Sequence, residues 1–292
     1  IQDYQRYSGE KKIALMDNST VSFLEQVERA GISTKELLKD YDAILIPNWV
    51  SEEICDSIYR KDYIERLYAA GLPIYSIAEE SYADLVNGEE ANLFKIVSAA
   101  ASKLGQLRGY LQQYVKKNDP LEMEEYAVWM NRMYQEWPLR GTTTRSGREK
   151  KKNAGEISLT ILAEVFSWYY PDSESITVYT QDRDSYDYQK SARERLNDVF
   201  ASKTSIDVSY KSNDTLLCQM FRNGMLSLGQ IDTLRCDERV VVYTRSRDDK
   251  STALVAKRTD NQQFKALLQD MNVQIIFWLL PIEHATNFST LL

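Results

Sequence analysis

Residues 12–20 read KIALMDNST, and this short stretch decides the fold class. Its four apolar residues, Ile13–Met16, are too few for a buried helix but enough for a strand covered on both faces. Asp17 ends the run, and Asn18 and Ser19 follow it with side chains that suit the cap of a helix. A buried strand that leads directly into a helix indicates a parallel sheet covered by helices.

The same alternation of short apolar runs and amphipathic segments recurs along the chain, without internal repeats. We therefore expect an α/β fold with a mainly parallel central sheet flanked by helices. The expected strands are Ile13–Met16, Ala43–Ile46, Pro73–Ile77, Ser175–Thr180 and Ile206–Tyr210.

Two further parts are expected outside this alternation. Apolar residues at three- and four-residue spacing over 89–115 and 121–137 predict a helical insertion, interrupted at Asp119-Pro120. Residues 239–258 resemble a β-hairpin, followed by a helix and the strand Val273–Phe277. We expect a main domain over 11–236, with its insertion at about 89–137, and a C-terminal α/β extension over 237–292.

The composition is that of a globular protein, with 43% hydrophobic and 27% charged residues. No uninterrupted apolar stretch long enough to span a membrane occurs, and the amino terminus has no apolar signal segment. Cys55, Cys218 and Cys236 are scattered and read as reduced thiols. We expect a cytoplasmic protein that does not contact a membrane.

A single histidine, His284 in the loop PIEHATN, argues against zinc sites and against catalysis by a Ser-His-Asp or Cys-His set. Any chemistry must therefore depend mainly on Asp, Glu, Lys, Arg, Ser or Tyr. The net charge of −7 argues against a surface coated for general nucleic-acid binding, although it leaves room for a local basic groove.

Acidic side chains occur where several expected strands end or helices begin. Asp17 follows the first strand, Glu53 lies early in the helix after the second, and Glu156 opens a helix before the fourth. Asp182 and Asp184 follow the fourth strand. Loops converge beyond the carboxyl ends of parallel strands, so these carboxylates should meet there. Their mutual repulsion would be relieved by Mg²⁺ or Mn²⁺, which prefer oxygen ligands.

Each acid alone has a simpler structural explanation. Asp17 suits a helix cap, Glu53 and Glu156 suit the positive end of a helix dipole, and Asp182 and Asp184 suit a turn. Taken singly, each structural explanation is the stronger one. Their shared position at one edge of the sheet favours a metal site.

A loop rich in glycine, threonine and basic residues, PLRGTTTRSGREKKKNAG over 138–155, precedes Glu156. Such a run is commonly a solvated loop, but its place at the rim of the acidic site suits a grip on a phosphate backbone. The expected nucleic-acid-binding residues are Arg140, Arg145, Arg148, Lys150, Lys151 and Lys152.

In this order the motifs resemble the PIN-domain family of metal-dependent ribonucleases, in particular a PIN-like subgroup with a Gly-Glu helix start. The resemblance covers about residues 11–236 discontinuously. It departs from the family in the larger helical insertion and in residues 237–292, which have no counterpart. The matching stretches are KIALMDNST (12–20), ILIPNWVSEEI (44–54), GEISLTILAEVF (155–166), VYTQDRDSYDYQKSARE (178–194) and NDTLLCQMFRNGML (213–226).

The resemblance implies endonucleolytic cleavage of RNA with Mg²⁺ or Mn²⁺. Asp17 and Asp182 would be the main metal ligands, with Asp184 a weaker candidate. Glu53, for which Glu52 is the near alternative, and Glu156 would complete the catalytic set. Many bacterial members are toxins controlled by a partner protein or effectors of defence against phage, so a regulatory partner or a homo-oligomer is also expected.

Other functions remain open at this point. One is a catalytically inactive PIN-like module that binds RNA or organises an assembly, and another is a metal-dependent DNA nuclease. A haloacid-dehalogenase-type phosphatase would need a second aspartate where Ser19 stands, and a P-loop enzyme would need a GxxxxGK[ST] motif that the chain lacks.

Overall fold

The structure is a computed structural model, and it describes residues 1–117, 125–143, 147, 149–235, 238–246 and 251–277. The chain divides into two compact units, Ile1–Asn213 and Asp214–Leu292. The sequence had suggested a boundary after residue 236, whereas this division begins the second unit before most of the helix α10 (Asn213–Arg222). Across the described segments, no helix has both the length and the apolar character needed to cross a membrane.

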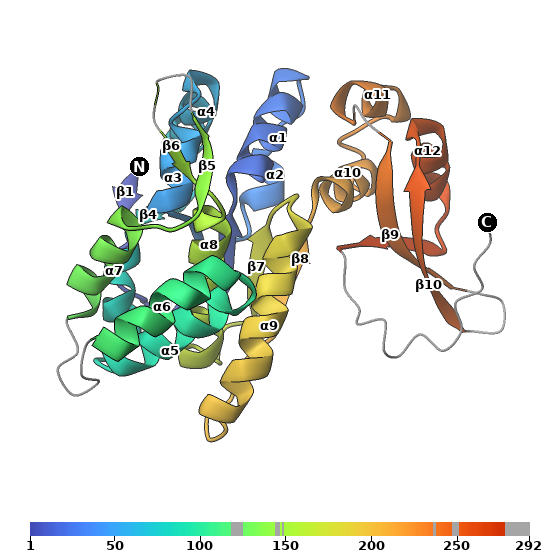
Figure 1. Ribbon diagram of the computed structural model, residues 1–292. Coiled ribbons are helices and arrows are strands. Elements are labelled where there is room, and N and C mark those ends of the chain that lie inside the picture. The colour runs from blue at the N-terminus through green and yellow to red at the C-terminus, as the bar shows by residue number, and fades with distance from the viewer. Residues whose placement is uncertain (118–124, 144–146, 148, 236–237, 247–250, 278–292) are drawn as a thin grey trace. The chain divides into compact units, whose positions relative to one another are not determined.

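A six-stranded sheet, parallel throughout, forms the centre of the first unit, as the sequence predicts (Figure 1). The five expected strands form within a residue or two of their expected bounds, and a short amino-terminal strand adds to one edge. The strands in spatial order are β1 (Gln2–Asp3), β4 (Ile74–Ile77), β3 (Ala43–Pro47), β2 (Lys12–Met16), β7 (Ser175–Tyr179) and β8 (Val208–Lys211).

The apolar runs of the central strands form the core. Ile13–Met16 of β2 are completely buried, and Ala43–Ile46 of β3 are at most 1% exposed. Removing one such side chain from water contributes about 1.5–3 kcal/mol, so a run covered on both faces stabilises its place at the centre.

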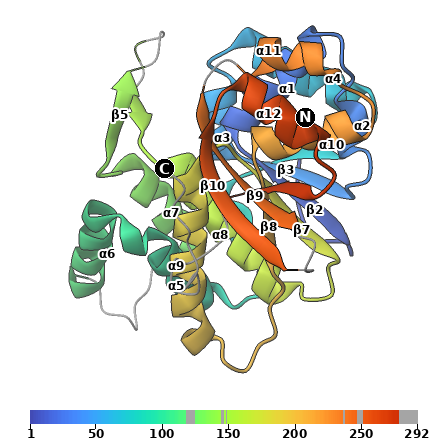
Figure 2. The same ribbon diagram turned by 90° about the vertical axis from the view of Figure 1, so that its right-hand side faces the viewer.

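Helices cover both faces of this sheet (Figure 2). α1 packs against α4, and α8 packs against α9 and contacts β2, β3 and β7. Right-handed crossovers place α1 and α4 on one face and α8 and α9 on the other, because the chain moves outward in opposite directions from β2 and from β7. These helices are α1 (Asn18–Arg29), α4 (Ile58–Ala69), α8 (Ala154–Tyr169) and α9 (Arg183–Val199).

The first unit also contains further helices, several of which form the expected insertion. The insertion is helical, but its first predicted helix is broken at 101–104, and the Asp119-Pro120 junction lies outside the described residues. These elements are α2 (Lys35–Leu38), α3 (Asn48–Ile54), the 3-10 helix η1 (Glu79–Leu85), α5 (Glu90–Ala100), the 3-10 helix η2 (Ala101–Lys103), α6 (Gly105–Lys117) and α7 (Tyr126–Gln135).

The second unit has its own antiparallel sheet, in the order β10-β9-β11, and contains the expected hairpin. Arg235 is completely buried within it, where it pairs with Asp214 at 3.1 Å and donates to the Thr259 carbonyl at 3.1 Å. After α10, its elements are the 3-10 helix η4 (Leu228–Gln230), α11 (Ile231–Leu234), β9 (Arg239–Ser246), β10 (Thr252–Thr259), α12 (Asn261–Gln269) and β11 (Val273–Ile276).

Candidate functional site

The strand order reverses between β2 and β7, and this is where the candidate acids gather. From β2 the chain continues to β3 and β4 on one side, and from β7 it continues to β8 on the other. In open parallel sheets such a switch point leaves a crevice beyond the carboxyl ends of the strands, the usual place for a ligand. Asp17 and Asp182 stand just after the two strands that flank it.

Asp17 joins the ends of these two strands. Its backbone N–H donates to the Tyr179 carbonyl at 2.9 Å, and its carboxylate accepts a hydrogen bond from the Thr180 hydroxyl at 2.9 Å. The same carboxylate caps α1 by accepting from the Asn18 N–H at 2.7 Å and the Ser19 hydroxyl at 2.5 Å. Burial raises the pKa of Asp17, while the hydroxyl donors Ser19 and Thr180 oppose that rise.

Glu53 reaches the cluster from α3. Its Oε2 atom accepts from the Asn18 amide at 3.2 Å, and the Oδ1 atom of that amide is buried with no hydrogen-bond partner among the described residues. Burial raises the pKa of Glu53, the positive charge of Lys150 lowers it, and the negative charge of Asp17 raises it further.

The glycine that precedes Glu156 allows α3 and α8 to approach closely. A Cβ atom on Gly155 would lie 3.2 Å from Val50 Cγ2 and 3.8 Å from Glu53 Oε1. This contact is the physical reason for a Gly-Glu start to α8: the missing side chain leaves room for the helix that carries Glu53.

Glu156 and Asp182 complete the cluster. Glu156 lies in the first turn of α8, and Asp182 caps α9 by accepting from the Asp184 N–H at 2.9 Å. Burial, the negative charge of Asp17, and the charge and hydrogen bonding of Asp182 raise the pKa of Glu156 to about 8. At neutral pH Glu156 therefore keeps its proton in preference to adding another negative charge.

Asp184 lies outside this group. It is exposed, on the first turn of α9. Its charge still acts on a neighbour of the cluster, Tyr188. Burial raises the pKa of Tyr188 to about 12, and the negative charges of Asp184, Glu156 and Asp182 raise it further. The structure thus brings Asp17, Glu53, Glu156 and Asp182 together, and places Asp184 on the solvent side of them.

The donor set fits a divalent cation in its chemistry but not in its present arrangement. Carboxylate oxygens are the ligands that Mg²⁺ and Mn²⁺ prefer. Burial is the first cause of the raised pKa values of Asp17, Glu53 and Glu156, and neighbouring carboxylates add to the rise at the two glutamates. Within the described parts of the chain, however, no three His, Cys, Asp or Glu side chains lie where they could jointly hold a metal ion. His284 lies outside the described residues.

The basic segment differs from the expected loop, because its two ends pair as an antiparallel hairpin, β5 (Arg140–Thr143) and β6 (Glu149–Lys151). In Figure 2 the strand β5 stands out from the helices of the first unit. A Cβ atom on Gly141 would lie 2.6 Å from the Lys150 carbonyl oxygen, so glycine permits this close pairing. Two threonines, which suit strands, follow this glycine in β5.

The expected cations of this segment have different surroundings. Arg140 lies 3.8 Å from Glu149, which belongs to the opposite strand of the hairpin, and Lys152 is exposed. The Lys151 ammonium lies 5.6 Å from the centre of the Tyr134 ring. Arg145 and Arg148 lie outside the described residues.

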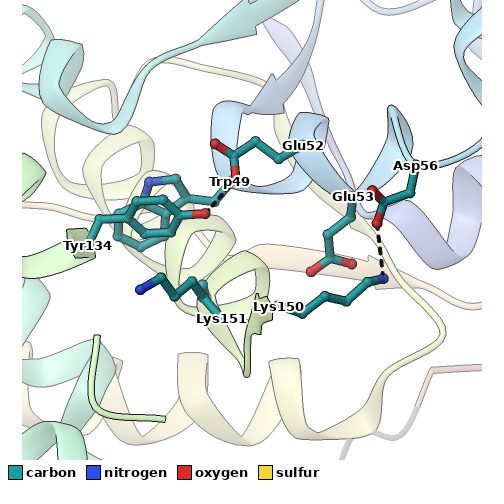
Figure 3. Close-up of a pocket in the computed structure, with 8 residues that line it drawn as sticks. Trp49, Glu52, Glu53, Asp56, Tyr134, Lys150 and Lys151 are labelled. Carbon is teal, nitrogen blue, oxygen red and sulfur yellow. Dashed lines mark hydrogen bonds and ion pairs between the residues drawn. The ribbon is translucent and has the colours of Figure 1, made fainter. Parts of the chain in front are cut away.

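Lys150 connects the hairpin to the acidic cluster. Its ammonium lies 3.6 Å from Asp56, and Figure 3 shows the Glu53 carboxylate pointing toward it. Lys150, Asp56 and Glu53 line a small pocket. Trp49 and Tyr134 also line it, and their rings are stacked with centres 4.7 Å apart.

Glu52 and Glu53, the two candidate glutamates after the second strand, both line this pocket but have different partners. The Tyr134 hydroxyl donates to Glu52 at 2.5 Å (Figure 3), whereas Glu53 accepts from Asn18 beside Asp17. The geometry therefore assigns Glu53, and not Glu52, to the acidic cluster.

Four polar residues of the site were not singled out from the sequence as site residues. Asn18 and Ser19 were interpreted only as helix caps, and their motif KIALMDNST was the available signal. Thr180 and Asp56 act through contacts with Asp17 and Lys150, which are far from them in the sequence, so only the fold reveals them.

Comparisons with protein-family models, with curated protein sequences and with solved structures give no match.

Proposed function

We propose that this chain is a Mg²⁺- or Mn²⁺-dependent nuclease that cleaves RNA, with a PIN-like acidic site. The observation that carries the proposal is the gathering of Asp17, Glu53, Glu156 and Asp182 at the switch point of the parallel sheet. A gathering of part-buried acids costs stability, so it favours a function that needs them.

Asp17 and Asp182 would hold the metal, with Glu53 and Glu156 completing the set. When bound, such a cation activates water and stabilises charge on a phosphodiester. Ser19 and Thr180 fix the Asp17 carboxylate through hydrogen bonds, and Asn18 holds Glu53. Glu156, with its pKa of about 8, can hold or release a proton near neutral pH.

A second candidate function is a PIN-like module that binds RNA without cutting it. The observation that favours it is the lack of a ready metal-ligand group within the described residues. Cleavage of DNA in place of RNA is a third outcome, because the same carboxylate chemistry serves both polymers. A toxin or phage-defence role in the cytoplasm, with a regulatory protein, follows from the family resemblance alone.

The deciding experiment incubates the purified chain with single-stranded RNA or DNA and Mn²⁺, with EDTA in parallel, and maps the ends of the products. We expect Mn²⁺-dependent internal cleavage of RNA, and at least a roughly 100-fold slower rate for Asp17→Asn. Asparagine is itself a good helix cap, so this variant should keep its stability within about 1 kcal/mol.

Asp198→Asn is the matched control, since Asp198 is an exposed aspartate near the far end of α9. It should cut RNA at the parent rate. RNA binding without cleavage at millimolar Mn²⁺ would support the inactive module. Equal cleavage by the parent and by Asp17→Asn would show that the acidic cluster is not the active site.

A further inference from the structure

A groove runs beside the acidic cluster in the first unit. One wall is a face of α1, the second is the turn 55–57 with the first residues of α4, and the third is the hairpin residues Thr142, Thr143 and Lys150.

The groove continues toward the carboxylates. Lys150 and Asp56 line the groove and also line the smaller pocket that contains Glu53 (Figure 3). A molecule lying along the groove and past Lys150 would therefore reach Glu53. This glutamate accepts a hydrogen bond from the side-chain amide of Asn18, the residue beside Asp17.

Among the described residues, three cations line the groove, although the whole chain has a net charge of −7. They are Arg29, Arg60 and Lys150. The acids of the groove are already paired, Glu25 with Arg29 and Asp56 with Lys150 at 3.6 Å. The pairing leaves a small surplus of positive charge. Such a surplus suits a few backbone phosphates and is too small for a broad electrostatic surface.

An exposed aromatic ring lies among these cations. Tyr59 is 62% exposed at the start of α4, and the Arg29 guanidinium lies 4.8 Å from the centre of its ring. Its neighbour Ile58 is 61% exposed. An open aromatic face beside cations is the arrangement with which proteins stack single-stranded bases and hold their phosphates.

A single nucleic-acid strand explains this combination better than an acidic peptide does. The carboxylates of such a peptide would approach Glu53 and the rest of the acidic cluster with no bound cation to offset the repulsion. A phosphodiester can share a divalent cation with that cluster. A duplex hides the faces of its bases, so it could not use Tyr59 for stacking.

We propose that this groove binds single-stranded nucleic acid, with Tyr59 stacking on a base and the positive charge of Arg29, Arg60 and Lys150 holding phosphates. The groove would lead the strand to the acidic cluster. The assignment of the cluster as the cutting site rests on the function proposed above, whereas binding in the groove can be measured without it.

The test measures fluorescence anisotropy of a fluorescein-labelled single strand of about ten nucleotides, as RNA and as DNA, in EDTA so that no metal-dependent cleavage occurs. Tyr59→Ala should weaken binding at least about fivefold, and Tyr59→Phe should retain it. Tyr68→Ala is the matched control, because Tyr68 is exposed on the same helix, half a turn around its axis. It should bind as the parent does.

A second pair of variants tests the phosphate contacts. Lys150→Ala should weaken binding and reduce by about one the slope of log affinity against log salt concentration. Lys95→Ala, an exposed lysine of α5 outside the groove, should leave that slope unchanged. A far-ultraviolet circular dichroism spectrum checks that each variant is folded.

Several results would overturn the groove proposal. They are no binding of either single strand by the parent, equal binding by Tyr59→Ala and Tyr68→Ala, or tighter binding of a duplex than of a single strand. The nuclease proposal fails separately, through cleavage by Asp17→Asn. If that variant still cuts RNA while Tyr59→Ala loses binding, the groove stands and the cutting site lies elsewhere.

Discussion

At position 17 one carboxylate has two tasks. Asp17 caps α1 through the Asn18 N–H, and it also accepts from Ser19 and from Thr180 at the end of the neighbouring strand. The simpler explanation of this residue, a helix cap, is therefore correct. It does not compete with a role in metal binding, because a carboxylate carries enough lone pairs for both.

Glu79 is a buried acid outside the cluster, and no local pattern in the sequence marks it. It begins η1, is completely buried, and accepts from the Trp49 N–H at 3.0 Å and the Ser158 hydroxyl at 2.7 Å. Its other oxygen has no hydrogen-bond partner among the described residues. Burial raises the pKa of Glu79 to about 8.

The raised pKa predicts a pH-dependent contribution to stability. Between about pH 4.5 and pH 8 the unfolded chain releases the proton of Glu79 and the folded chain keeps it. The contribution is therefore fully present below about pH 4.5 and is lost as pH rises to about 8, by up to about 1.4 kcal/mol per pH unit. Glu79→Gln should remove this part of the pH dependence, measured by urea unfolding at pH 5 and pH 8.

The control for this prediction is Glu65→Gln, the same chemical change at an exposed position of α4. It should follow the parent at both pH values. If Glu79→Gln also lost as much stability as the parent between pH 5 and pH 8, the proton of Glu79 would not be the cause.

At the scale of elements, the hairpin β5–β6 is the main difference from the sequence-based expectation. Its strands are short and almost entirely polar, so no apolar alternation marks them. The buried strands of the central sheet were predictable for the opposite reason: their continuous apolar runs are too short for helices.

Gly141 is the residue on which the hairpin depends most. With a methyl group only 2.6 Å from the Lys150 carbonyl oxygen, Gly141→Ala must displace one strand from the other. We expect a loss of single-strand binding as large as that of Lys150→Ala, with little change in melting temperature because both strands lie outside the buried core.

The control is Gly109→Ala, where a methyl group would meet nothing within 4 Å. Gly109 lies inside α6, and alanine is the better helix former, so this variant should gain about 0.5–1 kcal/mol of stability and bind as the parent does. Unchanged binding by Gly141→Ala would show that the hairpin does not position Lys150 for the ligand.

At the scale of the whole molecule, the acidic cluster couples stability to pH and to metal. Burial is the first cause of the raised pKa values of Asp17, Glu53 and Glu156. The stabilising contribution of these groups is present at low pH and is lost as pH rises, up to about pH 8 for Glu156. A cation bound to the ionised cluster would restore stability at the upper end of this range.

We therefore expect Mn²⁺ to raise the melting temperature more at pH 8 than at pH 5, because its carboxylate ligands must first lose their protons. At a concentration about 100 times its dissociation constant the ion adds about 2.7 kcal/mol. Differential scanning fluorimetry with and without Mn²⁺ measures the shift. Asp17→Asn should reduce it, whereas Asp198→Asn should not, and equal shifts in both variants would place the metal outside the cluster.

The parallel α/β sheet, the helical insertion and the places of the acids at strand ends and helix starts were predictable from the sequence alone. Those features follow from local patterns, because burial on both faces demands continuous apolar runs and helix starts favour acids. Only the tertiary structure decided that Glu53 joins the cluster while Glu52 bonds to Tyr134, and that Lys150 lies beside Asp56. It alone revealed the burial of Glu79. These contacts join residues far apart in the chain, and their formation depends on how the helices and the hairpin pack, which no local pattern records.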